Sequence, residues 1–91
     1  MRTRRFRLSW QYTDGYIPAK GTIDEWDYGQ EEFEATSDEA ATAIAGKRWE
    51  EIRKNLPRQQ AYTEDEIPHL KPRAEPTLTE LERVLDWKPV A

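Results

Sequence analysis

The sequence predicts a single α+β domain in which one main helix packs on one face of a three-stranded antiparallel sheet (β-β-β-α). Three observations predict this class. Residues 5–12 alternate between apolar and polar side chains, residues 22–35 repeat this alternation around a glycine, and residues 37–57 carry apolar side chains at helical spacing. A helix that covers one face of an antiparallel sheet buries both apolar surfaces, which suits a chain of 91 residues.

The first predicted strand is the arginine-rich segment near the N-terminus. Its apolar face consists of Phe6, Leu8, Trp10 and Tyr12. Its polar face consists of Arg5, Arg7, Ser9 and Gln11. A period of two with aromatic enrichment is typical of a strand with one buried face. The glycines and the proline of residues 13–21 predict a wide connection to the next strand rather than a tight hairpin.

A hairpin is predicted for residues 22–35, with residues 27–29 as its loop. Gly29 would supply the left-handed conformation that a three-residue loop requires. This register pairs Ile23 with Phe33 on the buried face, whereas a shift by one residue would pair Ile23 with a glutamate. The opposite face then consists of Thr22, Asp24, Trp26, Gln30, Glu32 and Glu34.

The main helix is predicted to begin at Ser37, a favourable N-cap that is followed by two acids in the first turn. Its apolar stripe consists of Ala41, Ile44, Ala45, Trp49, Ile52 and Leu56. Pro57 ends the helix, because the residue before a proline is disfavoured in the helical conformation. The predicted β-β-β-α core therefore spans residues 1–56.

The C-terminal third is predicted to contain an extended segment and a short helix. Residues 57–76 hold four of the six prolines and predict a proline-rich strap over the domain. Residues 77–88 predict a short helix, because Thr77 and Glu80 match a capping box. The apolar stripe of this helix consists of Leu78, Leu81, Val84 and Leu85.

The composition argues against several kinds of function. The chain has no cysteine, which excludes disulfides, thiolate metal sites and thiol catalysis. His69 is the single histidine, and the sequence has neither a glycine-rich phosphate loop nor a nucleophile–base signature. We therefore expect a non-enzymatic protein without cofactor or metal. No apolar run approaches the ~20 residues that span a bilayer, and no secretory signal is evident, so we expect no membrane partner and a cytoplasmic location.

Acidic and basic residues are segregated along the chain. Residues 1–20 hold five basic groups and one acid, while residues 21–46 hold eight acids and no base. In the predicted hairpin Asp24 faces Glu32, which is unfavourable unless a cation intervenes. Since the arginines of the first strand lie on the same face, the sequence predicts a cross-strand charge ladder.

The leading functional hypothesis is a protein-binding module whose acidic hairpin occupies a basic surface of a partner, with Trp26 as an aromatic anchor. The predicted binding residues are Asp24, Trp26, Asp27, Glu31, Glu32 and Glu34. Antitoxins and phage-encoded inhibitors of nucleases act in this general way. The segment FEATSDEAATAIAGKRW resembles the strand-into-helix step of HicB-type antitoxins in its Ser/Thr-x-Glu-Ala helix start. This resemblance covers fewer than twenty residues and is not accompanied by a DNA-binding tail, so no family is assigned.

Two alternative hypotheses remain. A nucleic-acid-binding domain would use the N-terminal arginines Arg2, Arg4, Arg5 and Arg7 beside a stacking Trp26, although a pI near 5.0 argues against it. A small structural subunit of a larger assembly would self-associate through an open edge strand as a homo-oligomer. Trp26 itself is expected either to anchor a partner or to be covered, for example by a stacked arginine.

Overall fold

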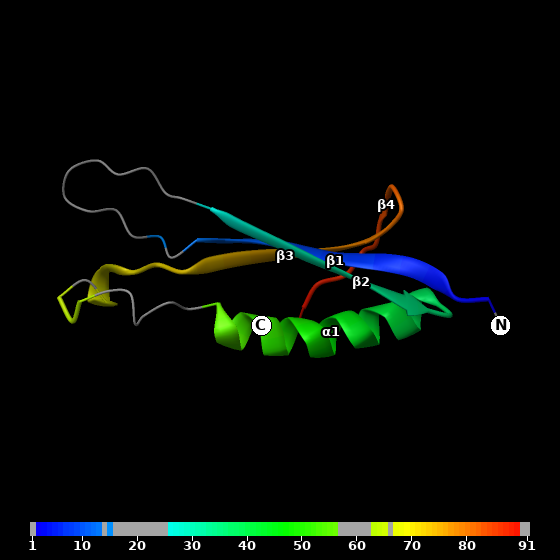
Figure 1. Ribbon diagram of the computed structural model, residues 1–91, viewed down its shortest axis with the longest axis horizontal. Helices are drawn as coiled ribbons and strands as arrows, with labels where there is room; N and C mark the ends of the chain where they lie inside the picture. The colour runs from blue at the N-terminus through cyan, green and yellow to red at the C-terminus, as the bar shows by residue number, and fades with distance from the viewer. Residues whose placement is uncertain (1, 14, 16–25, 57–62, 66, 90–91) are drawn as a thin grey trace.

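The computed structural model describes residues 2–13, 15, 26–56, 63–65 and 67–89. Within them the elements are β1 (Arg4–Thr13), β2 (Asp27–Ala35), α1 (Asp38–Asn55), the 3-10 helix η2 (Ile67–His69), β3 (Arg73–Glu80) and β4 (Arg83–Val84). The strands form one antiparallel sheet in the order β2-β1-β3-β4, and α1 lies along one face of it (Figure 1). The predicted α+β class is confirmed, but this sheet has four strands instead of three.

The alternation predicted for the first strand is confirmed in β1, which lies at the centre of the sheet. Phe6, Leu8 and Tyr12 are buried, and the half-buried Trp10 packs against the core. Because β1 pairs with β2 on one side and β3 on the other, its apolar face has neighbours on both sides. This central position explains why the strand with the clearest period-two pattern carries two of the three largest fully buried side chains.

The predicted loop at residues 27–29 is wrong, because these residues belong to β2 and pair with β1. Gly29 lies opposite Trp10, and a Cβ atom on Gly29 would overlap the Trp10 indole. The glycine therefore permits an aromatic ring to approach the backbone within a strand, rather than a left-handed turn. Phe33 accordingly pairs with Phe6 of β1. The predicted partner strand at 22–25, including Ile23 and Asp24, lies outside the described residues.

The main helix is confirmed. The Ser37 hydroxyl accepts a hydrogen bond of 3.0 Å from the backbone N–H of Ala40, as an N-cap residue should. The buried residues Ala41, Ala45 and Trp49 form the centre of its apolar stripe. The helix ends at Asn55 with Leu56 as its C-cap residue, immediately before the proline that predicted this end.

The predicted helix at 77–88 is wrong, because this region forms the hairpin of β3 and β4. Leu78 pairs with Leu8 and is 1% exposed, while Leu81 adopts a positive φ of 53° in the turn. Pairing with β1 buries Leu78 fully, and this long-range gain overrides the local helix signal. The last residues of the predicted strap, 73–76, also belong to β3, whereas 57–62 lie outside the described residues.

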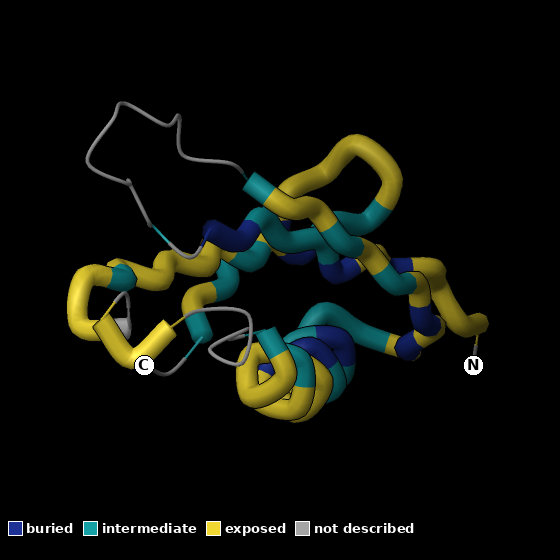
Figure 2. The backbone as a smooth tube through the Cα atoms, turned by 60° about the vertical axis from the view of Figure 1, so that its left-hand side comes forward, coloured by how far each residue is buried: buried dark blue, intermediate teal, exposed yellow. Residues whose placement is uncertain are grey.

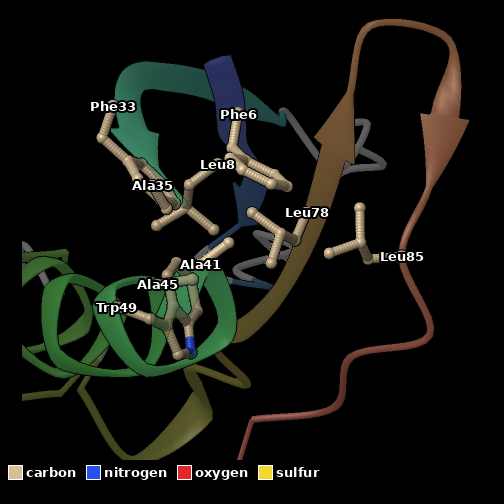
Figure 3. Packing of buried hydrophobic residues seen from close by; sticks show 9 residues of the cluster. All are labelled: Phe6, Leu8, Phe33, Ala35, Ala41, Ala45, Trp49, Leu78 and Leu85. Carbon is tan, nitrogen blue, oxygen red and sulfur yellow. The ribbon is translucent and has the colours of Figure 1, made fainter. Parts of the chain in front are cut away.

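The hydrophobic core lies between the sheet and α1, as the buried segments in Figure 2 show. In Figure 3 the side chains of Phe6, Leu8 and Leu78 extend from the sheet toward the helix. Among the described residues, the cluster consists of Phe6, Leu8, Phe33, Ala35, Ala41, Ala45, Trp49, Leu78 and Leu85. The fold is thus a two-layer α+β arrangement, and the other face of the sheet carries polar and charged side chains.

Candidate protein-binding surface

The predicted cross-strand charge ladder is confirmed at Glu32 on the outer face of the sheet, whereas its other predicted member Asp24 lies outside the described residues. Arg7 lies directly opposite Glu32, and its Nη2 donates a 2.8 Å hydrogen bond to Glu32 Oε1. Arg5 Nη1 lies 3.9 Å from the other carboxylate oxygen. The hydrogen bond from Arg7 holds the pKa of the Glu32 carboxyl below its ordinary value. Glu32 therefore already interacts with cations from the neighbouring strand.

A second charge cluster fastens the β3–β4 hairpin to the beginning of α1. Arg83 Nη2 lies 2.9 Å from Asp38 Oδ1 and 2.5 Å from Glu80 Oε1. Arg4 reaches the same two acids at 2.7 Å and 3.2 Å. Hydrogen bonding from Arg83 lowers the pKa of Asp38, and the same bond raises the pKa of the Arg83 guanidinium. We call Arg4, Asp38, Glu80 and Arg83 the hairpin cluster.

The arginines predicted for nucleic-acid binding do not form one track. Arg4 belongs to the hairpin cluster, whereas Arg5 and Arg7 lie on the outer face beside Glu32. Arg2 is exposed next to the start of β1. A phosphate backbone would have to displace carboxylates from three of these four side chains, so this geometry does not favour the alternative.

The acids predicted for partner binding share one strand but not one face. By the alternation of β2, Trp26, Glu32 and Glu34 belong to the outer face, and Asp27 and Glu31 to the helix side. Glu31 accepts a 3.2 Å hydrogen bond from Arg48 of α1, and Glu34 accepts one of 3.4 Å from Thr3. These acids therefore lie on both faces of the sheet, but all of them lie along the edge that β2 forms.

Trp26 is half-buried and is stacked by an arginine. The guanidinium carbon of Arg73 lies 5.0 Å from the centroid of the indole. Continuing the β1–β2 register by one residue places Trp26 beside Thr13, and Arg73 pairs with Thr13 from the other side. The stack thus lies across Thr13, which is 2% exposed. The anticipated cation–π cover is confirmed, although the sequence alone does not identify Arg73 as its source.

The two edges of the sheet differ in length. β2 forms one edge with nine residues, and no strand within the described residues pairs with its outer side. The other edge is interrupted: β4 covers Thr79 and Glu80 of β3 with two residues, and residues 73–78 of β3 form the rest of it within the described part of the chain. An edge strand presents unpaired backbone N–H and C=O groups, which can pair with another chain. The longer row of such groups lies along β2.

A cavity beneath Gly29 was not anticipated from the sequence. It has a volume of about 180 Å³ and lies between β2 and the C-terminal end of α1. Its lining residues are Trp10, Tyr12, Asp27, Tyr28, Gly29, Asn55 and Leu56. The one signal for it in the sequence is Gly29, a residue type that equally predicts a turn. Because β2 is an edge strand, this cavity lies at the edge of the sheet, on its helix side.

Comparisons with known proteins identify no relative. No family model matches the chain, and neither a curated protein nor a solved structure matches it. Within the described ranges, no three His, Cys, Asp or Glu side chains are grouped to hold a metal ion. None of the described helices is both long and apolar enough to cross a membrane. Inference about function therefore depends on the geometry of the sheet edge.

Proposed function

We propose that the protein is a non-enzymatic protein-binding module in which β2 pairs with an extended, basic segment of a partner protein. The observation that supports this proposal is the nine-residue edge strand Asp27–Ala35, which contains four acids and no base. An added strand would satisfy the backbone groups along this edge and draw affinity from main-chain hydrogen bonds. Its side chains would then supply specificity.

The position of the ladder favours a basic partner even though Glu32 is already paired. An added strand would lie ~4.8 Å from β2 but about twice that distance from β1. The acids Glu32 and Glu34 would thus be closer to the partner than Arg5 and Arg7, which are partly screened at this separation. A carboxylate has several acceptor positions, so Glu32 can bind a second base while it keeps its bond to Arg7.

Pairing between two copies of β2 is less favourable than pairing with a different protein. The four acids of each copy would lie along one seam, and like charges on facing strands destabilise a sheet. Within the described residues the opposite edge is divided between the two residues of β4 and residues 73–78 of β3, which β4 does not reach. These charges argue for a hetero-complex over the homo-oligomer that an open edge would otherwise permit.

Charge reversal at the edge tests the proposal. The probe is a peptide as long as β2 in which lysine alternates with valine, and the titration is followed by calorimetry at low salt. Glu34→Lys should weaken binding by about tenfold, because like charges then face each other across the new pair of strands. Glu82→Lys changes the net charge equally but lies in the exposed β3–β4 turn, and it should bind like the wild type.

Three outcomes would overturn the proposal. One is the absence of peptide binding to the wild type at low salt. Another is an equal loss of affinity in Glu34→Lys and Glu82→Lys, which would show attraction to net charge without a site. The third is tighter binding of a labelled single-stranded oligonucleotide than of the peptide, which would favour nucleic acid as the ligand.

A further inference from the structure

The cavity beneath Gly29 adds a second feature to the edge of β2. Since Gly29 has no side chain, the indole of Trp10 occupies the space that a Cβ atom would need. Trp10 is only half-buried. Its indole lies beside that of the buried Trp49, with 6.2 Å between the ring centroids. The apolar part of the cavity lining is the Trp10 indole and the half-buried Leu56 at the end of α1, while Asp27 and Asn55 supply polar groups. The indole and the leucine suit an apolar group.

We infer that the partner segment inserts one apolar side chain into this cavity and places basic side chains opposite Glu32 and Glu34. The inference rests on the proposed function, because it assumes that a strand adds to β2. It goes further in assigning a residue pattern to that strand. The cavity and the two acids lie at fixed positions of one strand, and they therefore fix both the spacing and the orientation of the groups that they bind.

The spacing follows from the geometry of strands. Side chains of an added strand alternate between the two faces of the sheet in step with those of β2. Residues opposite Glu34 and Glu32 therefore point to the outer face, while the residue opposite Gly29 points to the helix side and the cavity. An antiparallel segment would read base-x-base-x-x-apolar, and a parallel segment would read the same pattern in reverse.

The remaining acid on the helix side does not require a base from the partner. Glu31 lies between the cavity and Phe33 along β2, and Arg48 of α1 already binds its carboxylate at 3.2 Å. The residue opposite Glu31 can thus be neutral and polar. Glu32 on the outer face differs, because its cations come from β1 and lie on the side away from the added strand.

Two peptides of identical composition test the pattern. One reads Lys-Thr-Lys-Thr-Thr-Leu, and the other exchanges the last two residues so that leucine faces outward. Both are made in forward and reversed order, so that either strand polarity can pair. The better orientation of the first peptide should bind at least about tenfold more tightly, because only there is the leucine removed from water.

The indole N–H resonances provide a direct readout of the cavity in the same titration. The Trp10 resonance, assigned with a Trp10→Phe variant, should shift with the first peptide and not with the second. Trp87 lies in the C-terminal segment outside this cavity, and its resonance should stay in place.

The outcomes separate the two proposals. Equal affinities, or a shift at Trp87 without one at Trp10, would overturn the inferred pattern. If both peptides still bound and Glu34→Lys still weakened their binding, the proposed function would stand and only the inferred residue pattern would be rejected. If neither peptide bound at low salt, both the pattern and the proposed function would be contradicted.

Discussion

The two edges of the sheet are built in opposite ways. At one edge the two-residue strand β4 turns back on β3, and the hairpin cluster ties it to the beginning of α1 (Figure 1). At the other edge β2 is more than four times as long, and within the described residues it has no neighbour on its outer side. Proteins usually shorten or cover their sheet edges to prevent pairing with other chains. The long, uninterrupted edge of β2 is therefore the place where we propose that a partner strand adds.

The hydrophobic packing on the helix side also differs between the two edges of the sheet. The side of the sheet next to β4 contributes Leu78 and Leu85 to the core, both buried. Under β2 the core is supplied by Phe33 and Ala35, whereas the part of the strand around Gly29 borders a cavity. Side chains next to β4 thus complete the hydrophobic core, whereas the cavity beside Gly29 of β2 leaves room for a further side chain.

The largest expected effect is on the closed side of the sheet. Leu78→Ala should lower the free energy of unfolding by about 2–5 kcal/mol, because it opens a void at a fully buried position. Chemical denaturation would measure this loss. Leu81→Ala is the control, since Leu81 is 89% exposed in the neighbouring turn and should change stability by less than about 0.5 kcal/mol. Equal effects of the two variants would contradict the assigned β3 register.

A smaller effect is expected on the open side. Gly29→Ala should destabilise the fold by about 1–3 kcal/mol, because the new methyl group displaces the Trp10 indole. Gly46→Ala is a matched control in α1, where nothing lies within 4 Å of the added carbon. It should stabilise the protein by up to about 1 kcal/mol through helix propensity. A Gly29→Ala variant as stable as the wild type would show that the indole does not lie against β2.

The smallest effect concerns the charges. Hydrogen bonds from Arg83 and Arg7 lower the pKa values of Asp38 and Glu32 from their ordinary values of 3.8 and 4.5. Because the folded pKa lies below the unfolded one, each group stabilises the fold above its ordinary value. That stabilisation is lost as the pH falls through this value toward the lower folded pKa.

Thermal melts between neutral and acidic pH would measure this charge effect. Asp38→Asn should melt below the wild type at neutral pH, and the difference should shrink as the pH falls past 3.8. Glu82→Gln, in the exposed turn, is the control and should follow the wild-type profile. A difference between wild type and Asp38→Asn that grew toward acidic pH would contradict the expected direction of this pH dependence.

Local patterns in the sequence were sufficient for β1 and α1. The alternation from Phe6 to Tyr12 and the helical spacing from Ala41 to Trp49 each specify a buried face without reference to the rest of the chain. The Ser37 cap marks the start of the helix equally directly. The Arg7–Glu32 ladder could also be predicted, because the two residues share a face once the strands are adjacent.

Elements that depend on distant partners were not predictable in this way. The spacing of leucines near Leu78 fits both a helix and a strand, and pairing with β1 at the other end of the chain decides between them. Gly29 fits both a turn and a close contact with an aromatic ring, and only the position of Trp10 distinguishes these roles. The Trp26–Arg73 stack and the cavity follow from these two long-range contacts, so they could be found only in the structure.

Amide hydrogen exchange with and without the lysine–valine peptide tests strand addition to β2 most directly. Since every second N–H of an edge strand points outward, the peptide should slow exchange at alternate residues of Asp27–Ala35 and leave Arg83 and Val84 unchanged. Slower exchange in β4 or along α1, with that of β2 unaltered, would contradict the account.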